Sequence, residues 1–371
     1  MKHIKNNFIL LIFIAFLTMG CVACGSKATS NGSMTKNGGE VSEYSIEEHA
    51  LPDANTNLIT ESDYWVRELD IKMAGDKVYR LAQLWGQDPE YNVELDLGYF
   101  IQVSEYPFTE WKSYEASFLN LDGEYEATDT RHGYHPCKIT GIYDDTVYFA
   151  AAGLQKNEKI CYALGKMDSS GTFSLTAGYP IIQEDPEYDT FCNDIFFDGI
   201  DTVYSYQTNP SGNDVISYKI SSGYMHKDSY PASIERIRIS KEGKAIWYGN
   251  KEDFFCGGEA ENMDNAVACK NEEERSSVEG AMQAHDGWYF SDAKSLKVTK
   301  DDKTSEELID WRSRGYNFST IHEMEVKDNS LQMLTDFEGR HYVIVVDLDS
   351  QKMVSKQEVV ISMPFEIPSL N

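Results

Sequence analysis

The chain has 371 residues and a formal net charge of −28, from 33 basic and 61 acidic residues. A chain of this length can bury a substantial core in one large repeat domain or in two ordinary domains. The acidic composition excludes a nucleic-acid-binding protein, because phosphates require a basic surface, and it argues against electrostatic adhesion to anionic lipids or wall polymers. Solubility outside the cell is the better interpretation of the charge.

The first 20 residues are typical of an export signal. Residues 2–5 include two lysines and a histidine, and residues 8–19 are apolar apart from Thr18. This apolar run is too short to cross a bilayer as a helix, but it is long enough for a secretion signal. We therefore predict a signal peptide at residues 1–20.

Two cysteines follow the apolar run directly, at positions 21 and 24. Small residues before a cysteine at this place resemble the lipobox of bacterial lipoproteins, in which the thiol is joined to diacylglycerol. We favour Cys21, which lies nearest to the apolar run and follows Gly20, with Cys24 as the alternative attachment site. Two acyl chains anchor a protein stably, since each buried methylene contributes about 0.8 kcal/mol. The competing interpretation is an ordinary secretory signal with incidental cysteines.

The next segment is polar. Residues 25–48 are rich in Ser, Asn, Gly, Thr and Lys and contain few large apolar side chains. Such a segment cannot bury enough surface to order itself, so we predict a flexible tether over residues 21–59. The folded domain is predicted to span residues 60–371.

One short unit recurs along the folded domain: a turn followed by an apolar and aromatic strand. Its clearest copy is His285–Asp292, and the tyrosines of the copies, or the equivalent residue, stand at positions 79, 148, 204, 248, 289 and 332. The later copies are spaced by 44, 41 and 43 residues, a period typical of propeller blades. A four-stranded sheet cannot bury both faces alone, whereas a closed ring of sheets covers the faces and removes free edges. We therefore predict an all-β fold, a β-propeller of six to seven blades with eight as the upper limit.

Other segments refine this prediction. An apolar strand such as Cys192–Phe197 precedes several of the turns, and the long first interval leaves room for an extra hairpin around the Asp122–Gly123 turn. Residues 65–71 and 356–361 are both strand-like and are candidates for one shared closing blade. Residues 271–284 are predicted to be a surface loop or short helix. A split into two domains is the structural alternative.

Metal-capable side chains are densest at His132, His135 and Cys137. Zinc would need a fourth ligand from elsewhere in the chain. Gly133 and Pro136 make the segment a turn, so its side chains need not converge. We interpret it as a loop between blades and predict no metal site and no cofactor.

Five cysteines follow the lipobox pair, and their spacing fits no zinc ribbon. Export permits disulfides, and Cys256 and Cys269 flank one loop, so a disulfide between them is a prediction. The pairing of the other three cysteines stays open.

The sequence contains none of the short motifs that mark a catalytic nucleophile, a zinc protease or a phosphate-binding loop. No pair of carboxylates stands out for glycoside hydrolysis. We therefore predict no catalytic residues and no enzymatic activity. Most of the 23 tyrosines and 6 tryptophans are expected to pack between blades rather than to bind a ligand.

Three segments near the end of the chain have a familiar pattern: Asp-Gly-Trp-Tyr-Phe at residues 286–290, Ser-Glu-Glu-Leu-Ile-Asp-Trp at residues 305–311, and Lys-Gln-Glu-Val-Val-Ile-Ser at residues 356–362. With the lipobox and the tether, they resemble the N-terminal propeller of large extracellular solute-binding lipoproteins of Gram-positive anaerobes. In that group a substrate-binding domain of the periplasmic-binding type follows the propeller, whereas this sequence ends at Asn371. The resemblance covers roughly residues 60–362 and implies a binding role without transferring any ligand residue.

We accordingly expect a membrane-anchored extracytoplasmic lipoprotein whose propeller binds a ligand, such as a glycan or a peptide, or a partner protein. The alternatives are an accessory component of sugar or peptide uptake, and a propeller-type hydrolase of extracellular carbohydrate. The expected location is the outer face of a bacterial cell membrane, of the Gram-positive type. The covalent lipid provides the membrane contact, and nucleic acid is not an expected partner.

Overall fold

The structure is a computed structural model that describes residues 64–361, apart from 89–92, 117–134, 155–159, 180–191, 210–211, 231–232, 240–244, 252–253, 260–261, 271–279, 285–286, 292–293, 300–304 and 319. All described residues belong to one compact unit, Ile46–Asn371. The predicted signal peptide, the lipid-attachment cysteines and the tether lie outside the described residues. Among the residues described, no helix has the length and apolar character needed to span a membrane.

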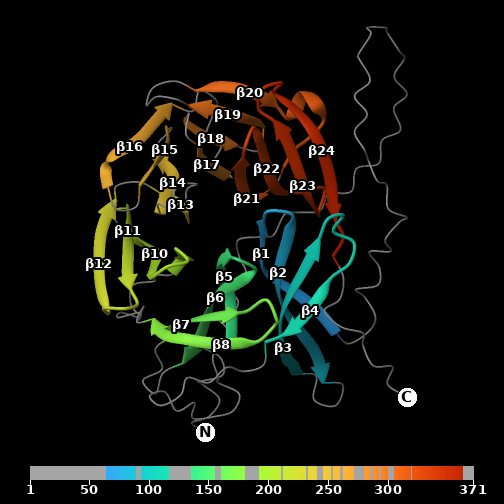
Figure 1. The fold of residues 1–371 in the computed structure, drawn as a ribbon, viewed down its shortest axis with the longest axis vertical. Coiled ribbons are helices and arrows are strands. Elements are labelled where there is room, and N and C mark those ends of the chain that lie inside the picture. The colour runs from blue at the N-terminus through green and yellow to red at the C-terminus, as the bar shows by residue number, and fades with distance from the viewer. Residues whose placement is uncertain are drawn as a thin grey trace. The chain divides into compact units, whose positions relative to one another are not determined.

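The described residues form six antiparallel sheets, and each sheet consists of four strands that are consecutive in the chain. Figure 1 shows these sheets arranged around a common centre, as the blades of a β-propeller. The first three sheets contain β1 (Tyr64–Ala74), β2 (Lys77–Asp88), β3 (Val93–Glu105) and β4 (Lys112–Glu115); β5 (His135–Tyr143), β6 (Thr146–Leu154), β7 (Ile160–Met167) and β8 (Phe173–Tyr179); and β9 (Cys192–Phe197), β10 (Thr202–Asn209), β11 (Gly212–Lys219) and β12 (Tyr224–Tyr230). The last three contain β13 (Ser233–Ile239), β14 (Ala245–Lys251), β15 (Phe254–Glu259) and β16 (Asn262–Lys270); β17 (Gly280–Ala284), β18 (Gly287–Ser291), β19 (Ser295–Thr299) and β20 (Glu306–Asp310); and β21 (Thr320–Lys327), β22 (Ser330–Phe337), β23 (Arg340–Asp347) and β24 (Lys352–Val359).

The recurring sequence unit forms the second strand of every sheet. The six equivalent positions are Tyr79 in β2, Tyr148 in β6, Tyr204 in β10, Tyr248 in β14, Tyr289 in β18 and Gln332 in β22. In the sheets whose linking residues are described, the turn of the unit closes the hairpin between the first and second strands. Between β5 and β6, Asp144 and Asp145 both have positive φ, at 48° and 60°, which suits a tight hairpin turn whose twist matches the flanking strands. The prediction of an all-β propeller built from this repeat is confirmed.

The upper part of the predicted range, a seventh and an eighth blade, is wrong for the described residues. The six sheets above account for all the strands in the described ranges, so the seventh and eighth blades are not found there. The first interval of the repeat is long because β2 and β3 are long strands and because residues 117–134, which are not described, lie between β4 and β5. The predicted extra hairpin falls largely on these residues, and Tyr114 at its start lies in β4, the edge strand of the first sheet.

Two further predictions are corrected. The chain ends do not share a closing blade, because residues 65–71 lie in β1 of the first sheet and residues 356–359 lie in β24 of the last. Gly280–Ala284, predicted as part of a loop or short helix, is a strand that pairs with β18. The sheet ladder supplies the backbone hydrogen bonds that these residues would otherwise have made in a helix.

The first strand of each sheet is its innermost strand, and contacts between first strands join β1 to β5, β5 to β9, β9 to β13, β17 to β21, and β21 to β1. At the junction between the last sheet and the first, buried apolar side chains from both sheets form one cluster: Ile71, Met73, Val78, Phe108, Leu334, Val343 and Val359. An ion pair spans the same junction, with Lys72 Nζ 3.4 Å from Glu323 Oε2. The ring therefore closes by side-chain packing rather than by a shared sheet.

A larger cluster joins the fifth and sixth sheets. It contains the aromatic residues of the clearest repeat copy, since Trp288, Tyr289 and Phe290 are all buried. Trp311 lies in the same cluster and donates a hydrogen bond from Nε1 to Ser291 Oγ at 3.0 Å. The prediction that the aromatic residues of the repeat pack between sheets is confirmed for this copy.

Candidate functional site

An open groove of about 790 Å³ lies between the first and second sheets. Its residues come from the ends of β2, β3 and β7, from β4 and the loop that precedes it, and from the turns that follow β5 and β7. Four aromatic side chains are among them: Tyr79, Tyr106, Trp111 and Tyr114. The volume falls within the range of about 300–1,000 Å³ that is usual for small-molecule sites.

The loop Tyr106–Trp111 forms one wall of the groove. At its centre, Phe108 has a φ of 62° although it is a bulky residue, and its side chain is buried in the cluster that closes the ring. A conformation of this kind is strained and persists only where the surrounding structure holds it, which is common at ligand-binding loops. Tyr106 packs edge-on against Phe108, with ring centroids 5.8 Å apart, and its own side chain is 56% exposed.

The last sheet holds this loop in place. Gln357 Nε2 donates a hydrogen bond to the carbonyl oxygen of Pro107 at 3.1 Å. The backbone N–H of Val360 donates to the carbonyl oxygen of Phe108, also at 3.1 Å. In return, Trp111 Nε1 donates to the carbonyl oxygen of Val360 at 2.5 Å. Three bonds from segments about 250 residues apart therefore fix the aromatic loop before any ligand binds, which lowers the entropic cost of binding.

Charged groups connect the two sheets at the groove. Lys77 Nζ lies 2.7 Å from Asp145 Oδ1 and 3.5 Å from Glu105 Oε1, and the Tyr79 hydroxyl donates to Asp145 Oδ1 at 3.4 Å. The hydrogen bond from Lys77 and its positive charge hold the pKa of Asp145 below its ordinary value. Burial raises the pKa of Tyr79 to about 12, so its hydroxyl stays protonated at neutral pH. The groove thus offers fixed hydrogen-bonding groups beside its aromatic side chains.

Tyr114 lines the groove from β4 and packs against the second sheet. Its ring covers Gly171, where an added Cβ would lie 2.2 Å from the ring, so only glycine permits this approach. Lys112 Nζ lies 4.9 Å from the centre of the Tyr114 ring, within the range of a cation–π contact. The orientation of Tyr114 is therefore fixed from two sides.

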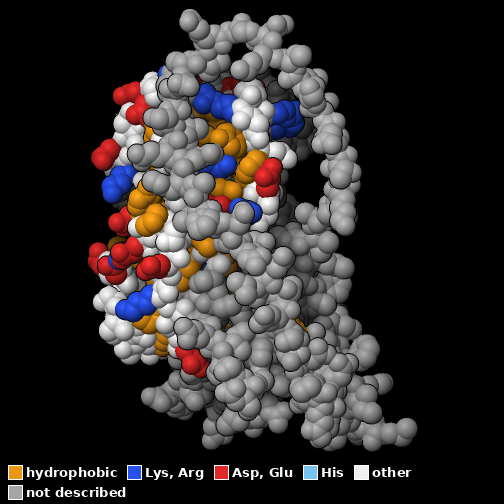
Figure 2. All heavy atoms as spheres, turned by 90° about the vertical axis from the view of Figure 1, so that its right-hand side faces the viewer, with side chains coloured by type: hydrophobic (Ala, Val, Ile, Leu, Met, Phe, Trp, Pro, Cys, Tyr) orange, Lys and Arg blue, Asp and Glu red, His pale blue; other side chains and the backbone are white. Residues whose placement is uncertain are grey.

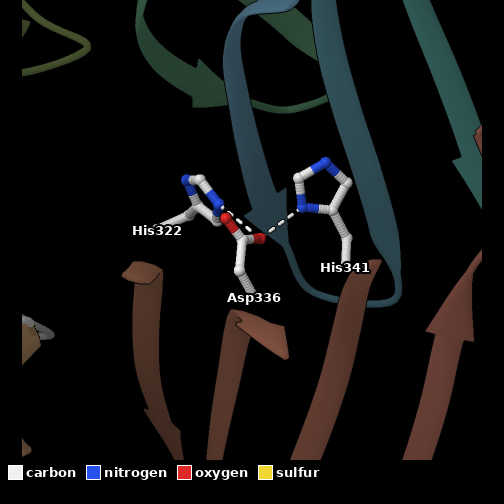
Figure 3. A group of neighbouring side chains, drawn as sticks. All are labelled: His322, Asp336 and His341. Carbon is white, nitrogen blue, oxygen red and sulfur yellow. Dashed lines mark hydrogen bonds and ion pairs between the residues drawn. The ribbon is translucent and has the colours of Figure 1, made fainter. Parts of the chain in front are cut away.

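A second group of polar side chains lies at the junction between the last and first sheets. His322 from β21, Asp336 from β22 and His341 from β23 converge, and one candidate ligand atom from each lies within 4.8 Å of the others (Figure 3). His322 Nε2 is 2.8 Å from Asp336 Oδ1, and His341 Nδ1 is 2.5 Å from the same oxygen. The three side chains are only 15–22% exposed.

The first sheet adds a further carboxylate to this group. His341 Nε2 lies 3.2 Å from Glu68, and Glu68 Oε2 accepts a hydrogen bond from Arg80 Nε at 2.9 Å. Burial lowers the pKa of His341, but its hydrogen bonds to Asp336 and Glu68 and the charges of both carboxylates outweigh burial and raise the pKa to about 9. Burial would raise the pKa of Asp336, yet hydrogen bonds to both imidazoles and their positive charges hold it well below its usual range.

The structure does not bring together the metal-capable residues that the sequence singled out, His132, His135 and Cys137, as it does the histidine group. His132 lies outside the described residues. His135 and Cys137 lie in β5, so the prediction of a loop between blades is wrong for this part of the segment, because pairing with β6 makes it a strand. The His135 ring stacks on Tyr99 of the first sheet, with centroids 4.9 Å apart. Cys137 instead packs in the cluster between the second and third sheets. Its thiol donates a hydrogen bond to the carbonyl oxygen of Ala150 in the neighbouring strand β6 at 3.3 Å, and burial raises its pKa to about 12. A neutral, buried thiol is a poor metal ligand.

The remaining predicted site residues are located only in part. Cys21 and Cys24 lie outside the described residues, so lipid attachment stays a prediction. Cys256 in β15 is paired with Ala268 in β16, and Cys269 is paired with Phe255, so the two cysteines lie on adjacent strands, one register position apart. The disulfide between Cys256 and Cys269 also stays a prediction.

Neither the aromatic loop nor the histidine group was predicted from the sequence. One part was readable: Asp336 and His341 flank the two-residue Glu338–Gly339 turn, and a hairpin with such a turn places them directly opposite each other. The position of His322 was not readable, because a β-bulge between Ile321 and Glu323 directs its side chain.

The chain matches no family model and no curated protein. Solved structures of similar fold include puromycin hydrolase, with a TM-score of 0.46 and 8% identity over 83% of this chain and 56% of that chain. They also include YCF48 bound to a D1 peptide (TM-score 0.42, 8% identity, 81% of this chain and 85% of that chain) and TolB from Acinetobacter baumannii (0.39, 11%, 78% and 79%). The chain thus spans little more than half the length of puromycin hydrolase. Similarities this distant transfer no site.

Proposed function

We propose that this chain is a membrane-anchored extracytoplasmic binding protein whose β-propeller takes a neutral carbohydrate in the groove between the first and second sheets, without catalysing a reaction on it. The observation that carries the proposal is the aromatic loop Tyr106–Trp111, held in a strained conformation at the wall of that groove. Natural ligand sites combine aromatic surface with a few fixed polar groups in this way.

The groove favours a carbohydrate because it offers flat apolar surface beside hydrogen-bonding groups. Tyr106 presents an exposed ring, and an aromatic ring of this kind stacks on the apolar face of a sugar. Glu105, Glu110 and Asp145 provide carboxylates that accept hydrogen bonds from sugar hydroxyls, and Lys77 provides a donor. A peptide ligand is the competing possibility, which the test below distinguishes.

The surface supports binding through a site rather than through general charge. In the face seen in Figure 2, the described hydrophobic side chains lie between acidic and basic ones, and no single sign of charge covers the described part. The net charge of −28 would repel anionic polymers.

The test is a binding screen of the full chain, held in mild detergent, against neutral oligosaccharides and against peptides. We expect a carbohydrate ligand whose affinity falls by about 2-fold to 12-fold in Tyr106→Ala, since aromatic contacts of this kind are worth about 0.5–1.5 kcal/mol. Tyr224→Ala is the matched control, because Tyr224 is equally exposed, at 59%, but lies on β12. Equal loss in both variants, or binding of peptides alone, would contradict the proposal, and release of new reducing ends from the bound sugar would contradict the absence of catalysis.

The membrane anchor is tested separately by labelling growing cells with an alkyne-bearing fatty acid. We expect the chain to carry the label, Cys21→Ser to lose it and Cys24→Ser to keep it. Loss in Cys24→Ser alone would move the attachment site to that residue. A chain that carries no label would reject the anchor but would leave the carbohydrate site untouched, because the groove lies more than 50 residues further along the sequence.

A further inference from the structure

We propose that His322, Asp336 and His341 bind a divalent transition-metal ion of the zinc type at the junction between the last and first sheets. This site is separate from the groove proposed above, since none of its three residues lines that groove. The inference rests on how three neighbouring strands bring these side chains together.

The pairing register of β21, β22 and β23 brings the three side chains together. Asp336 pairs with His341 across the hairpin between β22 and β23, so both side chains stand on the same face of the sheet. On the other side of β22, Asp336 pairs with Thr320, and the bulge at His322 turns the imidazole toward the carboxylate. Figure 3 shows both imidazoles directed at Asp336.

The donor set matches the chemistry of the ion. The two imidazole nitrogens are borderline ligands, so together with one carboxylate oxygen they suit Zn²⁺, Co²⁺, Ni²⁺ and Fe²⁺ better than Ca²⁺ or Mg²⁺, which prefer oxygen ligands alone. Zinc takes such ligands at about 2.0–2.2 Å, which places two ligand atoms of a tetrahedral ion about 3.4 Å apart. Both nitrogens already lie within 2.8 Å of the carboxylate oxygen, so small side-chain rotations suffice to admit the ion.

The environment of His341 strengthens the assignment. Its Nδ1 faces Asp336, while its Nε2 faces Glu68 at 3.2 Å. A metal-bound histidine commonly donates its other N–H to a carboxylate, which fixes the ring and makes the ligand more basic. Glu68 is itself positioned by Arg80, whose Nη1 donates to Gln102 Oε1 at 3.0 Å. The first sheet therefore supplies the residues that orient His341, a proposed metal ligand from the last sheet.

Because these supporting residues belong to the first sheet, a bound ion would affect the contact between the last and first sheets. The ligands belong to the last sheet and their support belongs to the first, so a bound ion stabilises the contact through which the ring closes. Ion binding and ring closure are therefore thermodynamically linked.

The test uses the full chain without a histidine tag, stripped with a chelator and titrated with Zn²⁺ and with Co²⁺. We expect one equivalent to bind, and the Co²⁺ form to show the visible absorption of a low-coordinate nitrogen and oxygen site. Zn²⁺ binding should be lost in His322→Gln and Asp336→Asn, and Glu68→Gln should weaken it by about 10-fold to 100-fold.

His226→Gln is the matched control, because His226 is an exposed histidine on β12, and this variant should bind Zn²⁺ like the unaltered chain. Circular dichroism identifies any variant that does not fold, and the Co²⁺ spectrum of the unaltered chain tests the site without any substitution. Failure of the unaltered chain to bind either ion would overturn the proposal. Equal affinity of the His322→Gln, Asp336→Asn and unaltered chains would overturn it as well.

Discussion

Truncation of one buried leucine tests how the propeller ring closes. Leu334 in β22 is fully buried and packs in the cluster that joins the last sheet to the first. Leu334→Ala removes three carbon atoms, worth about 2.4 kcal/mol at about 0.8 kcal/mol for each buried methylene. The cavity left behind adds to this loss, so we expect the free energy of unfolding to fall by about 3–4 kcal/mol, within the usual range for such substitutions.

Urea denaturation followed by tryptophan fluorescence measures this change. Val354→Ala is the control, because Val354 lies in β24 of the same sheet but is 52% exposed, and its truncation should cost less than about 0.5 kcal/mol. A loss below about 1 kcal/mol in Leu334→Ala would refute the reasoning, since it would mean that the two sheets do not exclude water where they meet. If the free energy of unfolding instead depends less steeply on urea concentration, and unfolding begins at a lower urea concentration, the ring opens before the sheets unfold.

Three further predictions concern single residues. Gly165→Ala should destabilise the domain by about 1–3 kcal/mol in the same assay, because the new Cβ would lie 2.2 Å from the Phe149 ring, and a smaller loss would mean that this ring can move aside. Cys137 should resist iodoacetamide at pH 8 until urea unfolds the chain, because a pKa of about 12 leaves only roughly one thiol in 10⁴ as the reactive thiolate. Peptide mass spectrometry measures the labelling, and rapid labelling of the native chain would contradict the burial of this thiol. Tyr79 has its pKa raised from 10.0 to about 12 in the folded state, so its contribution to stability is complete below pH 10 and is lost as the pH rises through about 12. Tyr79→Phe should remove that part of the alkaline loss in a stability-against-pH curve, and an unchanged curve would show that the hydroxyl is not held in the protonated form.

The contact between the last and first sheets is the feature on which both proposed sites depend. Gln357 and Val360 hold the aromatic loop from one side of this junction, and Glu68 supports His341 from the other. A ligand at either site therefore binds a surface that exists only when the ring is closed. This explains how segments some 250 residues apart in the chain contribute to single sites.

The local pattern of the sequence was sufficient for the repeating unit. A turn followed by an apolar and aromatic strand is specified by neighbouring residues, so the second strand of all six sheets could be placed from the sequence, as could β9 at Cys192–Phe197. The same local information failed at Gly280–Ala284, because the partner strand decides whether such a short segment forms a strand or a helix. It also allowed a seventh and an eighth blade that the described residues do not contain, since the spacing between repeats does not distinguish long strands from additional ones.

The sequence by itself determined that the chain is all-β, repetitive and strongly acidic, because turn chemistry, strand periodicity and charge are properties of adjacent residues and of composition. Only the tertiary structure decided what meets at the ends of the ring. The strained loop at Phe108, the bulge at His322 and the convergence of Asp336 with His341 and Glu68 depend on register and on packing between strands that are far apart in the chain. Such contacts leave no periodic mark in the sequence, since each involves one residue from each of several elements rather than a run of neighbours.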